Sequence, residues 1–269
     1  MRVPRAWGDG GEGMAAAAAM AAPWPEAAVI EEDTLDAQIA AMARELPARP
    51  LVLGGCCCSH VGAVRELARR HHRIAVVWFD AHGDLNTPES SPSGHFHGMV
   101  LRTLLGAGPS EYVRQIRRPL QPSQIVLAGT RDLDPPERDY ITRAGIVVCT
   151  PEQLADAGHV VNCVRARGFG RVYVHLDLDC FRPEDVPDAL IPTRGGPSIA
   201  TVAAAIGALA AACDVVGFSI VEYVDRGGGS LDRLREIARI APHGAGGGRC
   251  GREIVGKEMG TGNNEGAVD

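Results

Sequence analysis

Residues 74–84 read IAVVWFDAHGD, in which six apolar residues are followed at once by two acids and a histidine. A short apolar run rich in β-branched and aromatic residues is typical of a strand buried on both faces. Comparable runs occur at residues 51–53, 125–128, 146–149, 172–178 and 215–221. Other segments have a helical period, at residues 60–71, 98–105, 135–143, 151–157, 160–167, 199–212 and 230–240. Strands that alternate with helices predict an α/β fold with a mostly parallel sheet covered by helices on both faces.

The composition fits a globular domain and excludes several classes of protein. The 269 residues are 45% hydrophobic and 22% charged, and the net charge is −6 without a block of Lys or Arg. We therefore expect no nucleic-acid partner, and the lack of an apolar run of about 18 residues predicts no membrane span. Three of the eight cysteines are adjacent, at residues 56–58. This pattern predicts reduced thiols and a cytoplasmic location rather than a disulfide scaffold.

One catalytic domain is expected over residues 31–241, between two ends that lack a core. The acidic, Gly-rich segment within residues 1–30 disfavours a cleaved signal peptide, so we expect a flexible leader, with Met14 as an alternative start. Residues 31–45 predict a helix whose first turn is acidic. Residues 242–269 are Gly-rich without apolar periodicity, which predicts a disordered tail.

Potential metal ligands follow three of the predicted strands. They are Asp80, His82 and Asp84 after the first, Asp177 and Asp179 in the second, and Glu222 after the third. Because the carboxyl ends of parallel strands meet at one crevice, we expect these side chains to converge. A single acid at a strand end is more often a helix cap, but two spaced clusters favour a metal, and their oxygen-rich set suits Mn²⁺. His175 is either a core histidine or a supporting group, and it stays unassigned.

Four motifs, in this order and spacing, resemble the ureohydrolase family of arginase and agmatinase, and arginase most. The motifs are DAHGDLNTPESSPSGHFHG at 80–98, GTRDLDPPE at 129–137, HLDLD at 175–179 and GFSIVEY at 217–223. The resemblance implies a three-layer α/β/α fold with a dinuclear manganese centre. It also implies hydrolysis of a guanidino group by metal-activated hydroxide, with L-arginine giving ornithine and urea as the expected reaction. A homo-oligomer, either a trimer or a hexamer, is implied too.

The resemblance also assigns metal ligands by position. Asp80 and Asp177 would bridge the two metals, Asp84 would bind metal A, and His82 and Asp179 would bind metal B. Two such ions can hold a hydroxide at neutral pH and fix its direction of attack.

Further positions match the family's catalytic and substrate contacts. His97 matches the proton-transfer histidine, and Glu222 matches the glutamate that pairs with the guanidinium. Three substrate contacts follow: Asn86 and Ser93 match contacts to the substrate α-carboxylate, and Asp134, with Glu137 nearby, matches the acid that recognises the α-amino group. These contacts favour L-arginine, which has an α-carboxylate, over agmatine, which has none.

The motif that precedes the acids departs from the family pattern. The family has Gly-Gly-Asp-His-Ser, whereas this chain has GGCCCSHVG at 54–62, which puts Cys57 in the place of a metal-binding histidine. A thiolate suits Zn²⁺ better than Mn²⁺. Three outcomes stay open: a dinuclear site with Cys57 as a ligand, a weak or absent metal A, and an inactive relative. His60 could replace the lost ligand only if the turn were remodelled.

Three further positions depart from the family pattern, and two of them, His95 and Ile191, weaken the choice of L-arginine as substrate. His95 replaces an asparagine, Ile191 replaces a threonine, and Ser219 replaces an aspartate. The alternative functions are an agmatinase-like hydrolase and a non-catalytic relative that binds a metal or a guanidino ligand. A cysteine hydrolase using Cys57 and a deacetylase of related fold are weaker alternatives.

Overall fold

The computed structural model describes residues 1–7, 11–20 and 28–240, and the predicted tail at 242–269 lies outside them. Its centre is a sheet in which seven strands are described, all parallel, in the order β1-β2-β7-β6-β3-β4-β5. The strands are β1 (Arg2–Val3), β2 (Leu51–Gly54), β3 (Ala75–Phe79), β4 (Ile125–Ala128), β5 (Val147–Cys149), β6 (Arg171–Asp177) and β7 (Asp214–Val221).

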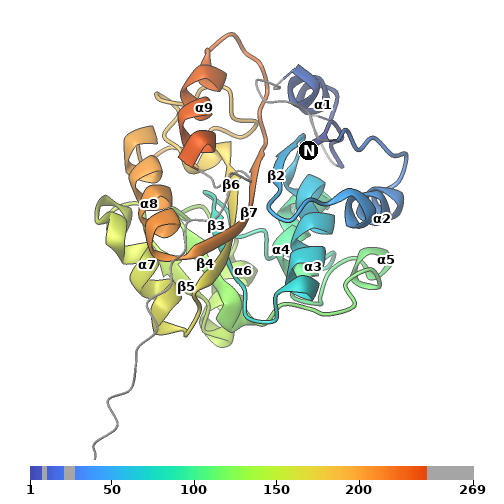
Figure 1. Cartoon of the computed structure of the whole chain (residues 1–269), viewed down its shortest axis with the longest axis horizontal. Helices are drawn as coiled ribbons and strands as arrows, with labels where there is room; N and C mark the ends of the chain where they lie inside the picture. Colours follow the sequence, from blue (N-terminus) through green and yellow to red (C-terminus); the bar gives the residue numbers. More distant parts are fainter. Residues whose placement is uncertain (8–10, 21–27, 241–269) are drawn as a thin grey trace, which may run out of the picture.

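Helices cover both faces of this sheet. They are α1 (Gly11–Met20), α2 (Leu35–Glu45), α3 (Val61–Arg70), α4 (Val100–Leu104), α5 (Ser110–Val113), α6 (Pro135–Ala144), α7 (Ala157–Ala166), α8 (Ile199–Ala212) and α9 (Ser230–Ile240). Figure 1 shows α7, α8 and α9 on one side of the sheet and α2 and α3 on the other. The predicted three-layer α/β/α architecture is therefore confirmed. Among the described residues, no helix combines the length and apolar character needed to cross a bilayer.

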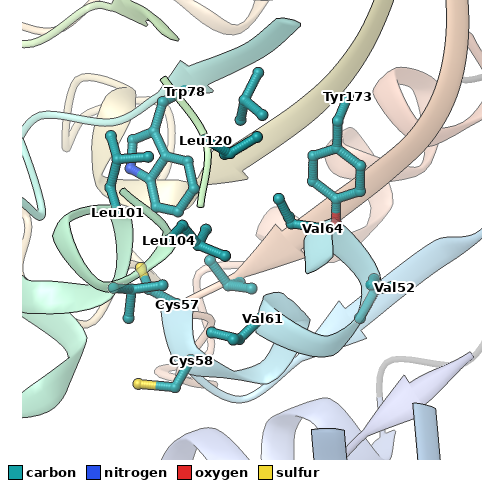
Figure 2. Close-up of a cluster of buried hydrophobic side chains, with 14 of the residues drawn as sticks. Val52, Cys57, Cys58, Val61, Val64, Trp78, Leu101, Leu104, Leu120 and Tyr173 are labelled. Atoms are coloured by element: carbon teal, nitrogen blue, oxygen red, sulfur yellow. The ribbon is translucent and has the colours of Figure 1, made fainter. Parts of the chain in front are cut away.

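Side-chain alternation along the strands divides the core into two clusters. On β3, Val76 and Trp78 face one cluster, whereas Val77 and Phe79 face the other. The first cluster contains sheet aromatics such as Trp78 and Tyr173, together with residues of α3 and α4 (Figure 2). Both faces of β3 are buried, which explains the uninterrupted apolar run at residues 74–79 of the sequence.

The register of the central strands sets the position of the site. Phe79, the last residue of β3, pairs with Leu176 of β6, and Asp177 pairs with Val221 of β7. Leu53 of β2 pairs with Ile220 of β7. The residues that follow these strands therefore leave the sheet at the same edge.

The ends of several elements differ from the prediction. The sequence predicted a flexible leader over residues 1–30, whereas the structure places Arg2 and Val3 in the sheet beside β2 and residues 11–20 in a helix. The amino group of Met1 donates to the Leu51 carbonyl at 2.9 Å. Two residues are too few for an apolar pattern to reveal a strand. The predicted helix at 151–157 is only a short 3-10 turn, Gln153–Ala155, because Asp156 then caps α7.

Gly217 of β7 lies against side chains of α3 and β6, with little room for a side chain of its own. A β-carbon at this position would lie 2.6 Å from Leu67 Cδ1 and 2.7 Å from Tyr173 Cδ2. We expect Gly217→Ala to lower the free energy of unfolding by about 1–3 kcal/mol through overpacking, measured by denaturant titration. Gly170 is exposed with open space around it, so Gly170→Ala should change stability by no more than about 0.5 kcal/mol. Equal effects of the two variants would contradict this packing account.

Candidate functional site

A pocket of about 510 Å³ opens at the carboxyl edge of the sheet and brings the predicted site residues together. Of the twelve residues predicted from the sequence, eleven line it: Cys57, His82, Asp84, Asn86, Ser93, His97, Asp134, Glu137, Asp177, Asp179 and Glu222. The twelfth, Asp80, is buried and is 1% exposed. Residues from the ends of five strands, β2, β3, β4, β6 and β7, thus meet at one place.

The first group of potential ligands contains Asp80, His82 and Asp179, whose ligand atoms lie within 4.8 Å of one another. His82 Nδ1 lies 2.9 Å from Asp179 Oδ2 and 3.5 Å from Asp80 Oδ1. Burial alone would lower the pKa of His82, but the two carboxylates outweigh it and raise this pKa to about 12. The backbone N–H of Ala81 donates to Asp179 Oδ1 at 3.0 Å, which fixes the carboxylate in place.

The second group contains Cys57, Asp80, His175 and Asp177, again within 4.8 Å of one another and all buried. The Cys57 thiol donates to Asp177 Oδ2 at 3.0 Å. His175, which the sequence left unassigned, places Nε2 3.9 Å from Cys57 Sγ and 3.7 Å from Asp80 Oδ2. His60 belongs to neither group: it stacks on His175, and both its ring nitrogens are buried without a hydrogen-bond partner in the described part of the chain.

The carboxylates of the site are buried against one another at high electrostatic cost. Burial raises the pKa of Asp84 well above its usual value, and Asp80 raises it further. Burial and the neighbouring Asp179 do the same to the pKa of Asp177. Within the described residues, Asp84 Oδ2 is buried and has no hydrogen-bond partner. Mutual repulsion and an unpartnered carboxylate oxygen are what a cation would relieve, so the residues fit a divalent metal.

Two site residues have a strained backbone. Asp84, with a φ of 52°, and Glu222, with a φ of 65°, are the non-glycine residues with a positive φ in the described ranges. This region of backbone conformation is unfavourable for most side chains. Both strained residues follow strands at the pocket edge, where such strain frequently accompanies function.

Glu222 and His97 lie close together in the lining of the pocket. Glu222 Oε1 accepts a hydrogen bond from the Cys57 backbone N–H at 3.0 Å and lies 3.9 Å from His97 Nδ1. Burial raises the pKa of Glu222 well above its usual value. A fixed carboxylate and a histidine at this distance can bind a cationic planar group and handle a proton beside it.

The outer wall of the pocket is held by side-chain hydrogen bonds. Asn86 Nδ2 donates to Asp134 Oδ2 at 2.8 Å. Glu137 accepts from the backbone N–H groups of Leu85, at 2.9 Å, and of Asp134, at 3.0 Å. These bonds use both Glu137 oxygens and tie the loop after β3 to the start of α6. Ser93 lies on the exposed loop, where its hydroxyl accepts from the His95 backbone N–H.

Sequence reasoning missed Arg131, which connects the loops around the site. Its guanidinium donates to backbone carbonyls that follow β4 and β6 and to the 193–194 loop: those of Gly129, Asp179, Cys180, Thr193 and Arg194. The residue lies inside the GTRDLDPPE motif, but a motif does not reveal that an arginine bonds to backbone. His175 was also unassigned, although its shared parity with Asp177 was the available signal.

The cysteine-hydrolase alternative is disfavoured by the surroundings of Cys57. Burial raises the pKa of the Cys57 thiol well above its usual value, and the nearby Asp84 and Asp177 raise it further. A nucleophilic cysteine needs the opposite environment, which stabilises the thiolate.

Several known arginases are similar to this chain. An arginase from Staphylococcus aureus (strain COL) is 38% identical over 155 residues, which cover 55% of this chain and 51% of the relative. The chain therefore spans about half the length of this and similar curated relatives. Among solved structures, the arginase of Bacillus caldovelox has a TM-score of 0.76 at 26% identity, covering 88% of this chain and 97% of that one.

A second solved structure extends the likeness of the fold. The Entamoeba histolytica arginase, determined in complex with L-ornithine, has a TM-score of 0.80 at 21% identity, covering 89% of this chain and 95% of that one. A family model described as the arginase family matches residues 17–225. By the extent of that match, the chain belongs to the arginase family.

Proposed function

We propose that this protein hydrolyses the guanidino group of a small substrate, with L-arginine giving ornithine and urea. The observation that carries the proposal is the shared pocket, in which Glu222 and His97 lie beside two groups of buried metal-ligand side chains. A guanidinium is a resonance-stabilised cation that water attacks slowly, so its hydrolysis needs both an activated nucleophile and a proton donor.

The proposed cofactor is a pair of divalent cations, with Mn²⁺ as the expected ion. Five residues would hold them, namely Asp80, His82, Asp84, Asp177 and Asp179, and the unpartnered oxygen of Asp84 supports this assignment. When bound, such a pair supplies an activated water as the nucleophile.

Glu222 and His97 would act directly on the substrate. The Glu222 carboxylate would pair with the planar guanidinium through charge-assisted hydrogen bonds, and the Cys57 N–H keeps one of its oxygens in position. The His97 imidazole would hold the proton that the leaving amine requires. Its side chain is 17% exposed, which leaves a route for proton exchange with solvent.

The far end of the pocket would select the substrate. Asp134 would recognise an α-amino group, and Asn86 and Ser93 would contact an α-carboxylate, with Glu137 bracing the wall. The Asn86–Asp134 hydrogen bond supports this division, because it keeps the amide and the carboxylate side by side at the pocket rim. An agmatinase-like activity is the second candidate, since Ile191 at the rim is 44% exposed and offers no polar contact. We expect the enzyme to work in the cytoplasm as a homo-oligomer, a trimer or a hexamer.

Removal of the Glu222 charge should reduce turnover without unfolding the protein. With L-arginine and added Mn²⁺, we expect Glu222→Gln to lower kcat/KM by about 10- to 100-fold, because one or two charge-assisted hydrogen bonds to the guanidinium are lost. The measurement is urea release. Glu111, exposed on α5, provides the matched control, because Glu111→Gln should leave kcat/KM unchanged. Folded, metal-loaded protein that releases no urea from any guanidino substrate would disprove the proposed activity.

The loop serine should distinguish the two substrates. We expect Ser93→Ala to raise the KM for L-arginine by about 2- to 10-fold, because one hydrogen bond to the α-carboxylate is lost. Agmatine has no α-carboxylate, so its KM should not change and it serves as the internal control. If both KM values rise equally, Ser93 orders the loop rather than contacting the carboxylate.

The metal-free protein should become less stable as the pH rises from about 7 to about 9. The pKa of His82, raised to about 12, keeps a proton on the folded state that the unfolded state, at about 6.5, has lost. A group whose pKa is higher in the folded than in the unfolded protein stabilises the fold less as the pH rises. The raised pKa values of Asp84 and Asp177 therefore lower the stability in the same direction as that of His82. The lowered pKa values of His60 and His175 change the stability only below about pH 6.5, so they do not affect this range.

Thermal unfolding in chelator and in Mn²⁺ checks this dependence. The Tm should fall with pH in chelator and fall less in Mn²⁺, because the cation replaces the protons that hold the carboxylates together. His82→Gln is expected to flatten the slope in chelator. A Tm of the metal-free protein that rises over this range would contradict the burial of these charges.

A further inference from the structure

We propose that one of the two metal positions is a mixed site formed by Cys57, His175, Asp80 and Asp177, which prefers Zn²⁺ or Co²⁺ to Mn²⁺. The inference rests on the proposed function, because it concerns the metal of the same pocket. It adds a ligand, His175, and it assigns the two metal positions different chemistry.

The distances between the four side chains match a compact coordination site. Cys57 Sγ lies 3.0 Å from Asp177 Oδ2 and 3.9 Å from His175 Nε2, which is 3.7 Å from Asp80 Oδ2. A tetrahedral Zn²⁺, with bonds of about 2.0–2.3 Å to sulfur, nitrogen and oxygen, separates its ligand atoms by about 3.3–3.8 Å. The side chains are therefore already near the separations that one such ion needs.

The His175 ring is held in an orientation that suits a ligand. Its Nδ1 lies 3.4 Å from Ser219 Oγ, so Nε2 is the nitrogen that faces the carboxylates. The ring stacks on Trp78, with ring centroids 3.6 Å apart, and contacts the ring of His60, with centroids 4.5 Å apart. A hydrogen bond to the other ring nitrogen and tight packing are what orient metal-binding histidines in proteins.

The positions of two substitutions are linked by this arrangement. Cys57 stands in the turn after β2 where the family has a histidine, and His175 of β6 places an imidazole in the same group of potential ligands. On β7, Ser219 pairs in register with His175, and its short side chain lies against the ring. An imidazole thus stays in the ligand set, although it comes from another strand, and a sulfur is added.

The ligand types of the two groups predict different metal preferences. Thiolate and imidazole select Zn²⁺ and Co²⁺, whereas the Asp80–His82–Asp179 group is richer in oxygen and suits Mn²⁺. Asp80 belongs to both groups and would connect the two ions. Asp84, with its unpartnered oxygen, lies in the same pocket and remains available as an additional ligand.

Other cysteines supply controls. Cys58 follows Cys57 in the same turn, but its sulfur lies toward the Trp7 carbonyl, at 3.7 Å, and Figure 2 shows the two sulfurs well apart. Cys149, His159 and Cys163 form another group of potential ligands on β5 and α7. Cys58→Ser therefore controls for a change in folding, and Cys163→Ser controls for metal bound to the other thiols.

The test is a Co²⁺ titration of the metal-free, full-length protein followed by absorption spectroscopy. Thiolate bound to Co²⁺ gives a charge-transfer band in the near ultraviolet, and we expect this band to saturate at one Co²⁺ per chain. Cys57→Ser should abolish the band, whereas Cys58→Ser and Cys163→Ser should retain it. His175→Gln should weaken Co²⁺ binding at least tenfold and shift the visible d–d bands. Cys57→His should raise the affinity for Mn²⁺ relative to Zn²⁺.

The outcomes separate this inference from the proposed function. A band that persists in Cys57→Ser, or two bound Co²⁺ ions without any band, would overturn the mixed site even if urea is released with Mn²⁺ alone. Visible d–d bands that are unchanged in His175→Gln would remove His175 from the site. A Cys57-dependent band in a protein that hydrolyses no guanidino substrate would leave the mixed site intact and disprove only the activity.

Discussion

Several carboxylates are buried together at one edge of the sheet, and their mutual repulsion must be offset for this part of the fold to be stable. Asp80, Asp177 and Asp179 are each less than 5% exposed, and they follow strands that pair directly with one another. Burial of several carboxylates in one place disfavours their charged forms. This edge of the fold is therefore stable only when protons or cations lie among these carboxylates. At neutral pH, bound cations are favoured over bound protons. The same buried carboxylates therefore affect both the stability of the protein and its chemistry.

The surrounding structure maintains this costly arrangement. Strands β3 and β6 are buried on both faces, which fixes the register of the acids that follow them. Arg131 then bonds to the carbonyls of loops that begin at separate strands, and Glu137 ties the loop after β3 to α6. The strained backbone at Asp84 and Glu222 persists because its neighbours are held so firmly. A rigid sheet edge with braced loops is the kind of support that a preorganised site requires.

Much of this could be predicted from the sequence, for physical reasons that differ between parts of the molecule. The apolar runs at 74–79 and 172–178 were long enough to identify buried strands, and topology alone then brought Asp80 and Asp177 to one edge. The short strand Arg2–Val3 carried no comparable pattern and was missed. His175 and Arg131 were not assigned, because their roles depend on contacts across the sheet and between loops. Such contacts follow from packing rather than from local pattern.

Elemental analysis of the protein, purified without chelator and dialysed, shows whether the buried carboxylates hold divalent cations beside Glu222. We expect two divalent ions per chain, and loss of both in the Asp80→Asn, Asp177→Asn double variant, which removes the two residues expected to bridge the ions. A folded wild-type protein that retains no ion, or a double variant that still retains both, would contradict this expectation.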